Sequence, residues 1–180
     1  MFELEKEKYL GNTKNILTTE QGIAVIETEY HQRVYEGFHS HDNAHLTLFL
    51  KGGTTEKRKN RTETVGPGSL LFYHSDELHS NHNTLFPSRN INIEIEENLL
   101  KELQISEAVI EKSIQNEAFT KFLILKIFKE TLTADTFSAD TIKMLFSQLS
   151  NANTHLERFE KSPFWVKSLN ELLNDCWNEN

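Results

Sequence analysis

FHSHDNAHLTLFLKGG, residues 38–53, places an apolar run between a group of histidines and a pair of glycines. A short apolar run that ends at turn residues is typical of a β-strand. Runs of this kind follow one another from residue 22 to residue 95, and the pattern predicts an all-β barrel or sandwich. The expected strands are residues 23–29, 44–51, 53–58, 61–65, 69–73 and 91–96.

The last of these strands alternates apolar and polar side chains in the order Ile91, Asn92, Ile93, Glu94, Ile95 and Glu96. Successive side chains of a strand point to opposite faces, so we expect one face of it to be buried and the other to be in water. Residues 54–65 are polar on both faces and have turn residues near positions 59 and 60. They predict an exposed hairpin.

After residue 96 the apolar residues recur at helical spacing. Residues 117–132 carry more apolar side chains than one contact face needs, so this helix is expected to have two partners. Another amphipathic helix should begin near Ser138, with this serine as its N-cap. Two interpretations remain open: the helices of residues 117–150 pack only within the chain, or they also join two copies in a homodimer.

A further helix is expected from Ser162 and Pro163, an N-cap followed by proline at the first helical position. Its apolar stripe consists of Trp165, Val166, Leu169, Leu172, Leu173, Cys176 and Trp177. Because the sequence given stops three residues after a helix this apolar, we expect that more sequence normally follows.

The chain has 180 residues, of which 37% are hydrophobic, enough for one packed domain and an additional element. Its formal net charge of −8 opposes DNA binding by this chain alone, since that affinity depends on Lys and Arg displacing counterions. The single cysteine, Cys176, cannot form an internal disulfide, and the first eight residues are too charged for a signal peptide. No apolar run approaches the length of a membrane span. We therefore expect a cytoplasmic protein without a membrane partner.

Four histidines are the most informative residues of the chain. His39, His41 and His45 share parity, so in an extended segment they can face the same side. His79, on a neighbouring strand, would complete a compact site, and imidazole suits zinc, iron, nickel or copper. The alternative is that these histidines are solvated or hydrogen-bonded without an ion. The remaining ones are expected at the surface or rim, with His82 as an exception near His79: His31, His74, His82 and His155.

In its first half the sequence resembles the cupin superfamily. The first cupin motif is matched by His39, His41 and Gly52, with His45 in the place of the motif's glutamate. Arg33 stands where the strict motif has its opening glycine.

The second cupin motif is matched at the family spacing by Gly68, His79 and Asn83, whereas His74 and Asp76 replace its usual proline and glycine. The resemblance implies a cupin-type barrel, mainly β, with helices after it. It also implies a divalent transition metal, such as zinc, nickel or iron, on four ligands. The loss of the glutamate removes a carboxylate base, which makes dioxygenase chemistry a weaker expectation. The implied ligands are His39, His41, His45 and His79.

Residues 38–41, 46–53, 65–72 and 77–79 together resemble the N-terminal domain of AraC-type transcription regulators. In that family, helices that dimerise follow the barrel, and a pair of helix-turn-helix units follows the helices. Residues 162–165, Ser-Pro-Phe-Trp, resemble the start of the first of those units. The resemblance therefore implies a sensor barrel over residues 1–96, a helical dimerisation or linker segment over 97–160, and the start of a truncated DNA-binding domain over 161–180.

The function expected from this resemblance is ligand sensing and dimerisation without catalysis. A small-molecule effector would bind inside the barrel, and DNA would be bound only through the missing C-terminal domain. A stand-alone metal-dependent cupin enzyme, an oxygenase or isomerase, is the alternative, and a cupin that stores or carries a ligand is a third hypothesis. The candidate ligand-binding residues are Phe49, Phe72, Tyr73 and His82.

Overall fold

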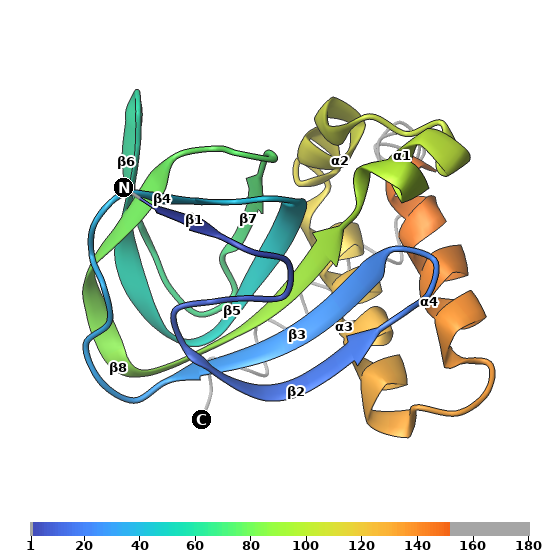
Figure 1. The fold of residues 1–180 in the computed structure, drawn as a ribbon, viewed down its shortest axis with the longest axis horizontal. Coiled ribbons are helices and arrows are strands. Elements are labelled where there is room, and N and C mark those ends of the chain that lie inside the picture. Colours follow the sequence, from blue (N-terminus) through green and yellow to red (C-terminus); the bar gives the residue numbers. More distant parts are fainter. Residues whose placement is uncertain (1, 152–180) are drawn as a thin grey trace, which may run out of the picture.

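The computed structural model describes residues 2–151, in which a curled sheet is followed by a group of helices (Figure 1). The strands are β1 (Phe2–Leu4), β2 (Asn12–Thr18), β3 (Ile23–Tyr30), β4 (His39–His41), β5 (Ala44–Arg58), β6 (Arg61–Val65), β7 (Leu70–Tyr73) and β8 (His79–Ile95). The helices are α1 (Glu97–Leu103), α2 (Glu107–Ser113), α3 (Glu117–Thr133), α4 (Ser138–Ser147) and the short 3-10 helix η1 (Gln148–Asn151). A mainly β fold with helices after it was predicted, and the structure confirms it.

Two long strands, β5 and β8, hold the sheet together. They pair with each other in antiparallel fashion, and β5 also pairs with β6 and β7, while β8 also pairs with β3 and β4. The predicted strands 44–51 and 53–58 form this single strand β5, whose pairing with β8 shifts register around Gly52 and Gly53. Both glycines have positive φ, and a Cβ on Gly52 would lie 2.5 Å from the carbonyl oxygen of Leu85. Such irregularities bend a strand, and here they accompany the curl of the sheet into a cup.

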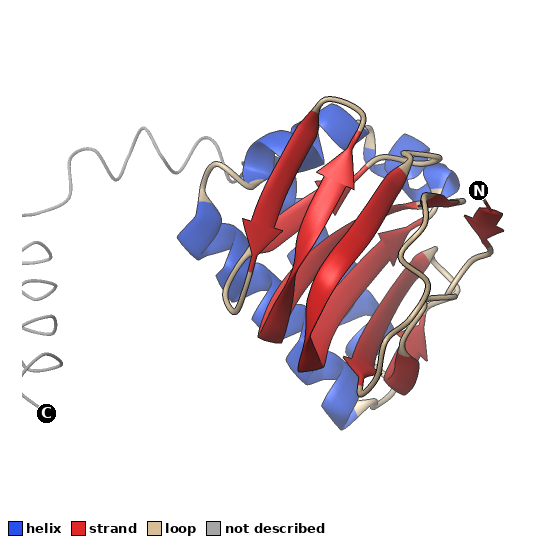
Figure 2. Ribbon diagram, turned by 90° about the vertical axis from the view of Figure 1, so that its left-hand side faces the viewer, coloured by secondary structure: helices blue, strands red, loops and turns tan. Residues whose placement is uncertain are grey.

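The helices cover one face of the sheet, as the side view shows (Figure 2). The apolar positions of β5 and β8 point to this face and form one buried core with the helices. Its members include Leu46, Leu48, Ile91, Ile93, Ile95, Leu123, Ile124, Ile127, Ile142 and Phe146. The main hydrophobic core therefore lies outside the cup, between the sheet and the helices.

The other face of β8 is also buried, so the prediction of a water-exposed polar face was wrong. Asn92 and Glu94 are only 2% and 3% exposed, because the sheet curls and turns this face toward the inside of the cup. The predicted hairpin turns at residues 59 and 60, as β5 pairs with β6 from Arg58↔Arg61 onward. Thr54 and Glu56 of this hairpin are nevertheless buried, for the same reason.

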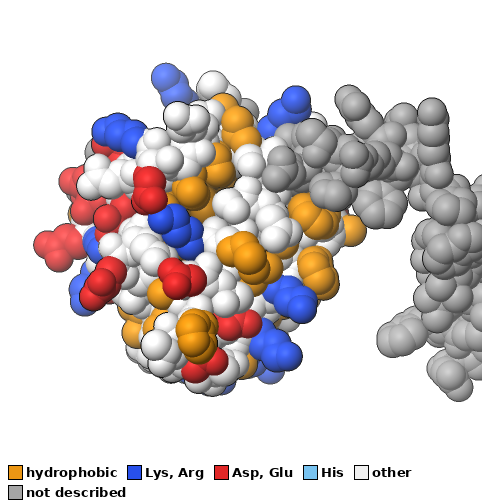
Figure 3. Space-filling view, turned by 90° about the vertical axis from the view of Figure 1, so that its right-hand side faces the viewer, with side chains coloured by type: hydrophobic (Ala, Val, Ile, Leu, Met, Phe, Trp, Pro, Cys, Tyr) orange, Lys and Arg blue, Asp and Glu red, His pale blue; other side chains and the backbone are white. Residues whose placement is uncertain are grey.

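The helical part differs from the prediction in two places. The seven-residue helix α2 was not predicted from the sequence. The N-cap of α4 is Phe137, and Ser138 is its first helical residue, where the hydroxyl contacts Asp135. On α3, Phe122 and Leu125 remain about half exposed, and the view onto this side shows hydrophobic side chains between charged ones (Figure 3).

No helix among residues 2–151 is long and apolar enough to cross a membrane. The helix predicted from Ser162 and Pro163 lies outside the described residues, as does the predicted DNA-binding segment over 161–180.

Ile93→Ala tests the position of the core. Ile93 is fully buried between the sheet and the helices, so the change should lower the free energy of unfolding by about 2–5 kcal/mol in urea titrations. Ile16→Ala is the matched control, because Ile16 lies on β2 with 42% of its surface exposed and should cost about 1 kcal/mol or less. Equal losses in the two variants would contradict this account of the core.

Candidate metal centre and ligand cavity

The inside of the cup contains a cavity with about 50 Å³ of space open to water-sized molecules. Histidines line one part of it, and neutral amides, hydroxyls and aromatic rings line the rest. No Lys, Arg, Asp or Glu of the described chain lines this cavity. The lining residues used below are Tyr9, Tyr30, His39, His41, His45, Thr47, Phe49, Tyr73, His79, Ser88, Asn90 and Asn92.

Three histidines meet at one end of the cavity. His39 and His41 lie on β4, and His79, the first residue of β8, pairs directly with His39. One ring nitrogen from each of the three lies within 4.8 Å of the others, and all three side chains are buried. Nitrogens at this spacing are within reach of one transition-metal ion, which binds imidazole at about 2.0–2.1 Å in the case of zinc.

His45 lies beside this cluster, and its nitrogens are not part of it. The sequence suggested one extended segment for residues 39–45, but the structure divides it into β4 and β5, with residues 42 and 43 between them. The His45 ring lies 4.4 Å from that of His41 and stacks on Tyr73 at 4.5 Å. It therefore packs next to the cluster without contributing a nitrogen to it.

Burial favours the neutral form of all three cluster histidines. Burial lowers the pKa of His41 to about 3, and the nearby His39 contributes to the shift. Burial, with a further contribution from His39, likewise lowers the pKa of His79 to about 3, and burial lowers the pKa of His39 as well. Neutral imidazole is the form that binds a metal ion, so protons compete little for this site near neutral pH.

Backbone carbonyls orient two of the rings. The Nδ1 of His39 donates to the carbonyl oxygen of Gly37 at 3.2 Å, and the Nδ1 of His79 donates to that of Glu77 at 3.0 Å. The Nε2 of each ring is then the lone-pair nitrogen, an arrangement that is usual for metal-binding histidines. Among the described residues, the buried Nδ1 of His41 has no hydrogen-bond partner. A buried polar atom without a partner calls for an explanation, and a metal or ligand supplies one.

Hydrogen-bonding groups line the cavity away from the histidines. Asn92 is fixed there, because it accepts from Thr47 at 2.8 Å and donates to Thr28 at 2.9 Å. Asn90, only 7% exposed, lines the same cavity, and its Oδ1 has no hydrogen-bond partner in the part of the chain that the structure describes. The same holds for the buried hydroxyl of Tyr9 within residues 2–151. Unpaired donors and acceptors in such a cavity favour a ligand that is itself polar.

The N-terminal segment closes one side of the cavity. β1 pairs in parallel with β4, and the Tyr9 ring then lies 4.9 Å from that of His41. The backbone N–H of Glu7 donates to the Glu94 carboxylate at 2.9 Å, and Lys6 bonds to Glu96. These contacts attach residues 2–9 to the rim of the cup.

Two of the four candidate ligand-binding residues line the cavity, and the other two do not. Phe49 and Tyr73 line the cavity. Phe72 points the other way, because it neighbours Tyr73 on the same strand, and it packs in the core with the helices. His82 is not among the lining residues, and its Nε2 lies 2.9 Å from the Ser80 hydroxyl. Tyr9 and Asn90 were missed, although the alternation in residues 91–96 extends back to Asn90 and was the signal for it.

The depressed pKa values predict that metal-free protein loses stability in acid. Unfolding lets His41 and His79 take up protons below pH 6.5 that the folded state binds only near pH 3, so the free energy of unfolding should fall as the pH falls through this window. Each histidine contributes a slope of up to about 1.4 kcal/mol per pH unit. Urea unfolding in the presence of EDTA at several pH values measures it. His79→Asn should flatten the dependence, with the exposed His31→Asn as control, and identical slopes for H79N and the unsubstituted protein would argue against neutral buried histidines.

The chain is distantly similar to several solved structures. No curated protein is detectably similar to the chain. Among solved structures, the DMSP lyase DddQ from Ruegeria pomeroyi has 18% identity and a TM-score of 0.39, over 43% of this chain and 40% of the lyase. KdgF from Halomonas sp. has 10% identity and a TM-score of 0.41, over 52% of this chain and 87% of KdgF. A cupin superfamily protein from Desulfitobacterium hafniense has 11% identity and a TM-score of 0.39, over 49% of this chain and 82% of that protein.

These distant likenesses say nothing about activity, and the chain spans well under half of the lyase's length. The family comparison is more informative, because the model described as "AraC-like ligand binding domain" matches residues 20–164. This match confirms the resemblance to the sensor domain of AraC-type regulators and its cupin-like fold. Since the match covers most of the sequence, the chain belongs to the AraC-like ligand-binding domain family.

Proposed function

We propose that the chain is the ligand-sensing and dimerising part of a cytoplasmic AraC-type transcription regulator, and that a separate domain of the full-length protein binds DNA. The observation that carries this proposal is the cavity inside the cup, in which Asn90 and His41 bury atoms that lack a hydrogen-bond partner within residues 2–151. The net charge of −8 supports the assignment of DNA binding to another part of the protein.

The effector is a small polar molecule. Asn90 offers an unpaired oxygen, so the effector carries a hydroxyl or N–H group that donates to it. The aromatic rings of Tyr9, Tyr30 and Phe49 supply apolar faces on the same cavity. A divalent metal ion on the three-histidine cluster would provide a positive charge that the lining itself lacks. Because the N-terminal segment and the helices both border the cup, occupancy of the cavity would bias their positions.

Titration with Zn²⁺ or Ni²⁺ alone, by calorimetry on the apo protein, tests the metal centre. His79→Ala removes one of three ligands and should weaken binding about a hundredfold or more. His82→Ala is the matched control and should bind as the unsubstituted protein does. His45→Ala should have a smaller effect than H79A, since His45 lies behind the cluster; a loss as large as that of H79A would favour the four-histidine site.

Dimerisation is proposed through the α3–α4 patch, the exposed apolar residues Phe122, Leu125, Leu132 and Met144. Each is about half exposed or more, which costs free energy in water unless another surface covers it. A second copy is the occupant that suits a regulator with two DNA-binding domains.

Leu125→Glu should raise the dimer dissociation constant at least about tenfold in sedimentation experiments, because it places a charge in the α3–α4 patch. Leu85→Glu is the matched control: Leu85 is 65% exposed, but it lies on β8, away from this patch. A dimer that survives L125E and is lost in L85E would place the interface on the sheet.

A metal-dependent enzyme is the second candidate, because three histidine ligands leave coordination positions open for water and substrate. The described residues that line the cavity supply no carboxylate that could act as a base there. Turnover of small hydroxylated substrates by Zn²⁺-, Ni²⁺- or Fe²⁺-loaded protein, lost in H79A, would favour the enzyme over the sensor.

A further inference from the structure

The loop between β7 and β8, residues 74–78, touches two of the cluster histidines through its backbone. The carbonyl oxygen of Glu77 accepts the hydrogen bond that orients the His79 ring, at 3.0 Å. The backbone N–H of Asp76 donates to the carbonyl oxygen of His41 at 2.9 Å. Any change in the position of these two histidines is therefore transmitted directly to the β7–β8 loop.

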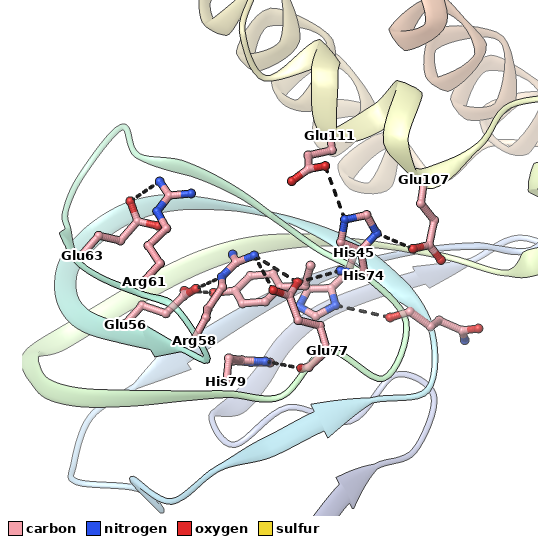
Figure 4. Close-up of polar contacts among 12 residues, drawn as sticks. His45, Glu56, Arg58, Arg61, Glu63, His74, Glu77, His79, Glu107 and Glu111 are labelled. Carbon is pink, nitrogen blue, oxygen red and sulfur yellow. Dashed lines mark hydrogen bonds and ion pairs between the residues drawn. The ribbon is translucent and has the colours of Figure 1, made fainter.

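The same loop is attached to helix α2 at its other side (Figure 4). The Nδ1 of His74 donates to the carboxylate of Glu107 at 2.6 Å, and the hydroxyl of Ser75 donates to the other oxygen of that carboxylate. The Nε2 of His74 lies 3.4 Å from a carboxylate oxygen of Glu111. Two residues of the loop thus converge on Glu107, the first residue of α2.

Internal hydrogen bonds make the β7–β8 loop a stiff connection. The Glu77 carboxylate accepts two hydrogen bonds from Arg58, both at 3.0 Å, and another from the backbone N–H of His74 at 3.1 Å. Arg58 in turn is bonded to the buried Glu56, which also accepts from Tyr73. Both bonds to Glu77 come from one guanidinium nitrogen, Nη1, and such charge-assisted hydrogen bonds are stronger than neutral ones. Both ends of the loop, at His74 and at Glu77, are therefore held relative to each other.

We propose that the β7–β8 loop couples occupancy of the histidine cluster to the docking of α2, with Glu107 as the residue on the helix that receives the signal. This inference rests on metal binding at His39, His41 and His79, as proposed above. An ion that holds the His79 ring in place would also hold the carbonyl of Glu77, to which this ring is hydrogen-bonded. The loop would then be held as well, and with it the contacts of His74 and Ser75 with Glu107. Coupling is reciprocal, so a firmly docked α2 also favours metal binding.

Helix α2 is well placed to pass such a signal on. It lies against η1, the last element that the structure describes. Its Ile110 is fully buried in the core between the sheet and the helices, and the Glu107 contacts add a polar attachment to the loop of the cup. Occupancy of the cavity therefore reaches the helical layer at a point separate from the α3–α4 patch.

Hydrogen–deuterium exchange of the α2 amides, with and without saturating Zn²⁺, tests the coupling on the whole chain. In the unsubstituted protein Zn²⁺ should slow exchange in residues 107–113 about fivefold or more, the lower end of common coupling strengths. Glu107→Ala should reduce this effect of Zn²⁺ on exchange to less than about twofold. Because coupling is reciprocal, the same variant should bind Zn²⁺ more weakly by the factor by which the exchange effect falls. Glu117→Ala is the matched control, because Glu117 is the first residue of α3 and pairs with Lys121 of its own helix.

Further variants and outcomes separate the possible failures. Glu107→Gln keeps an oxygen that accepts hydrogen bonds and should retain most of the effect. If E107A unfolds α2, Ser75→Ala replaces it as the test, because it weakens the same contact from the loop side. Zn²⁺ binding with unchanged exchange in α2 would overturn the coupling and leave the metal centre intact. An unsubstituted protein that binds no Zn²⁺ would overturn both, and an equal loss of coupling in E107A and E117A would assign the effect to charge alone.

Discussion

The structure depends on a strand alternation in which both faces become buried. On β5 and β8, every second residue is apolar and packs against the helices, while the residues between them point into the cup. The apolar half supplies the free energy that holds sheet and helices together. The polar half contributes little to that core and is left for binding. Stability and ligand recognition are thereby assigned to opposite faces of the same strands.

This division explains how buried histidines and amides are tolerated. Asn92 is satisfied by Thr47 and Thr28, and two of the cluster histidines are satisfied by backbone carbonyls. Three of the residues that keep an unpaired buried atom within residues 2–151 line the cavity: Tyr9, His41 and Asn90. The desolvation cost of those atoms is what a polar ligand or a metal ion would recover on binding. The same cost appears in the lowered pKa values of the histidines.

The sequence predicts the end of β8 well because Ile91, Ile93 and Ile95 leave little choice of period, and the helical spacing of residues 117–132 is equally clear. The short strands β1 and β4, the strand β2 and residues 79–90 of β8 were not among the expected strands. The sequence did not reveal whether the alternating Asn and Glu side chains meet water or a closed interior, since alternation is the same in both cases and only the curl of the sheet decides. His45 was expected to face the same side as His39 and His41 because all three were counted along one extended segment. That segment is interrupted at residues 42 and 43, so the count does not hold for His45. Helix α2, with seven residues and two buried side chains, is too short for a periodic signal.

We propose that three histidines at one end of a cavity lined by neutral groups form the metal centre of a sensor domain. X-ray absorption at the zinc edge of the Zn²⁺-loaded protein tests it most directly, because the fine structure counts imidazole ligands around the ion. The account predicts three imidazole nitrogens at about 2.0–2.1 Å, completed by oxygen. A shell without imidazole, or one with four imidazoles, would contradict it.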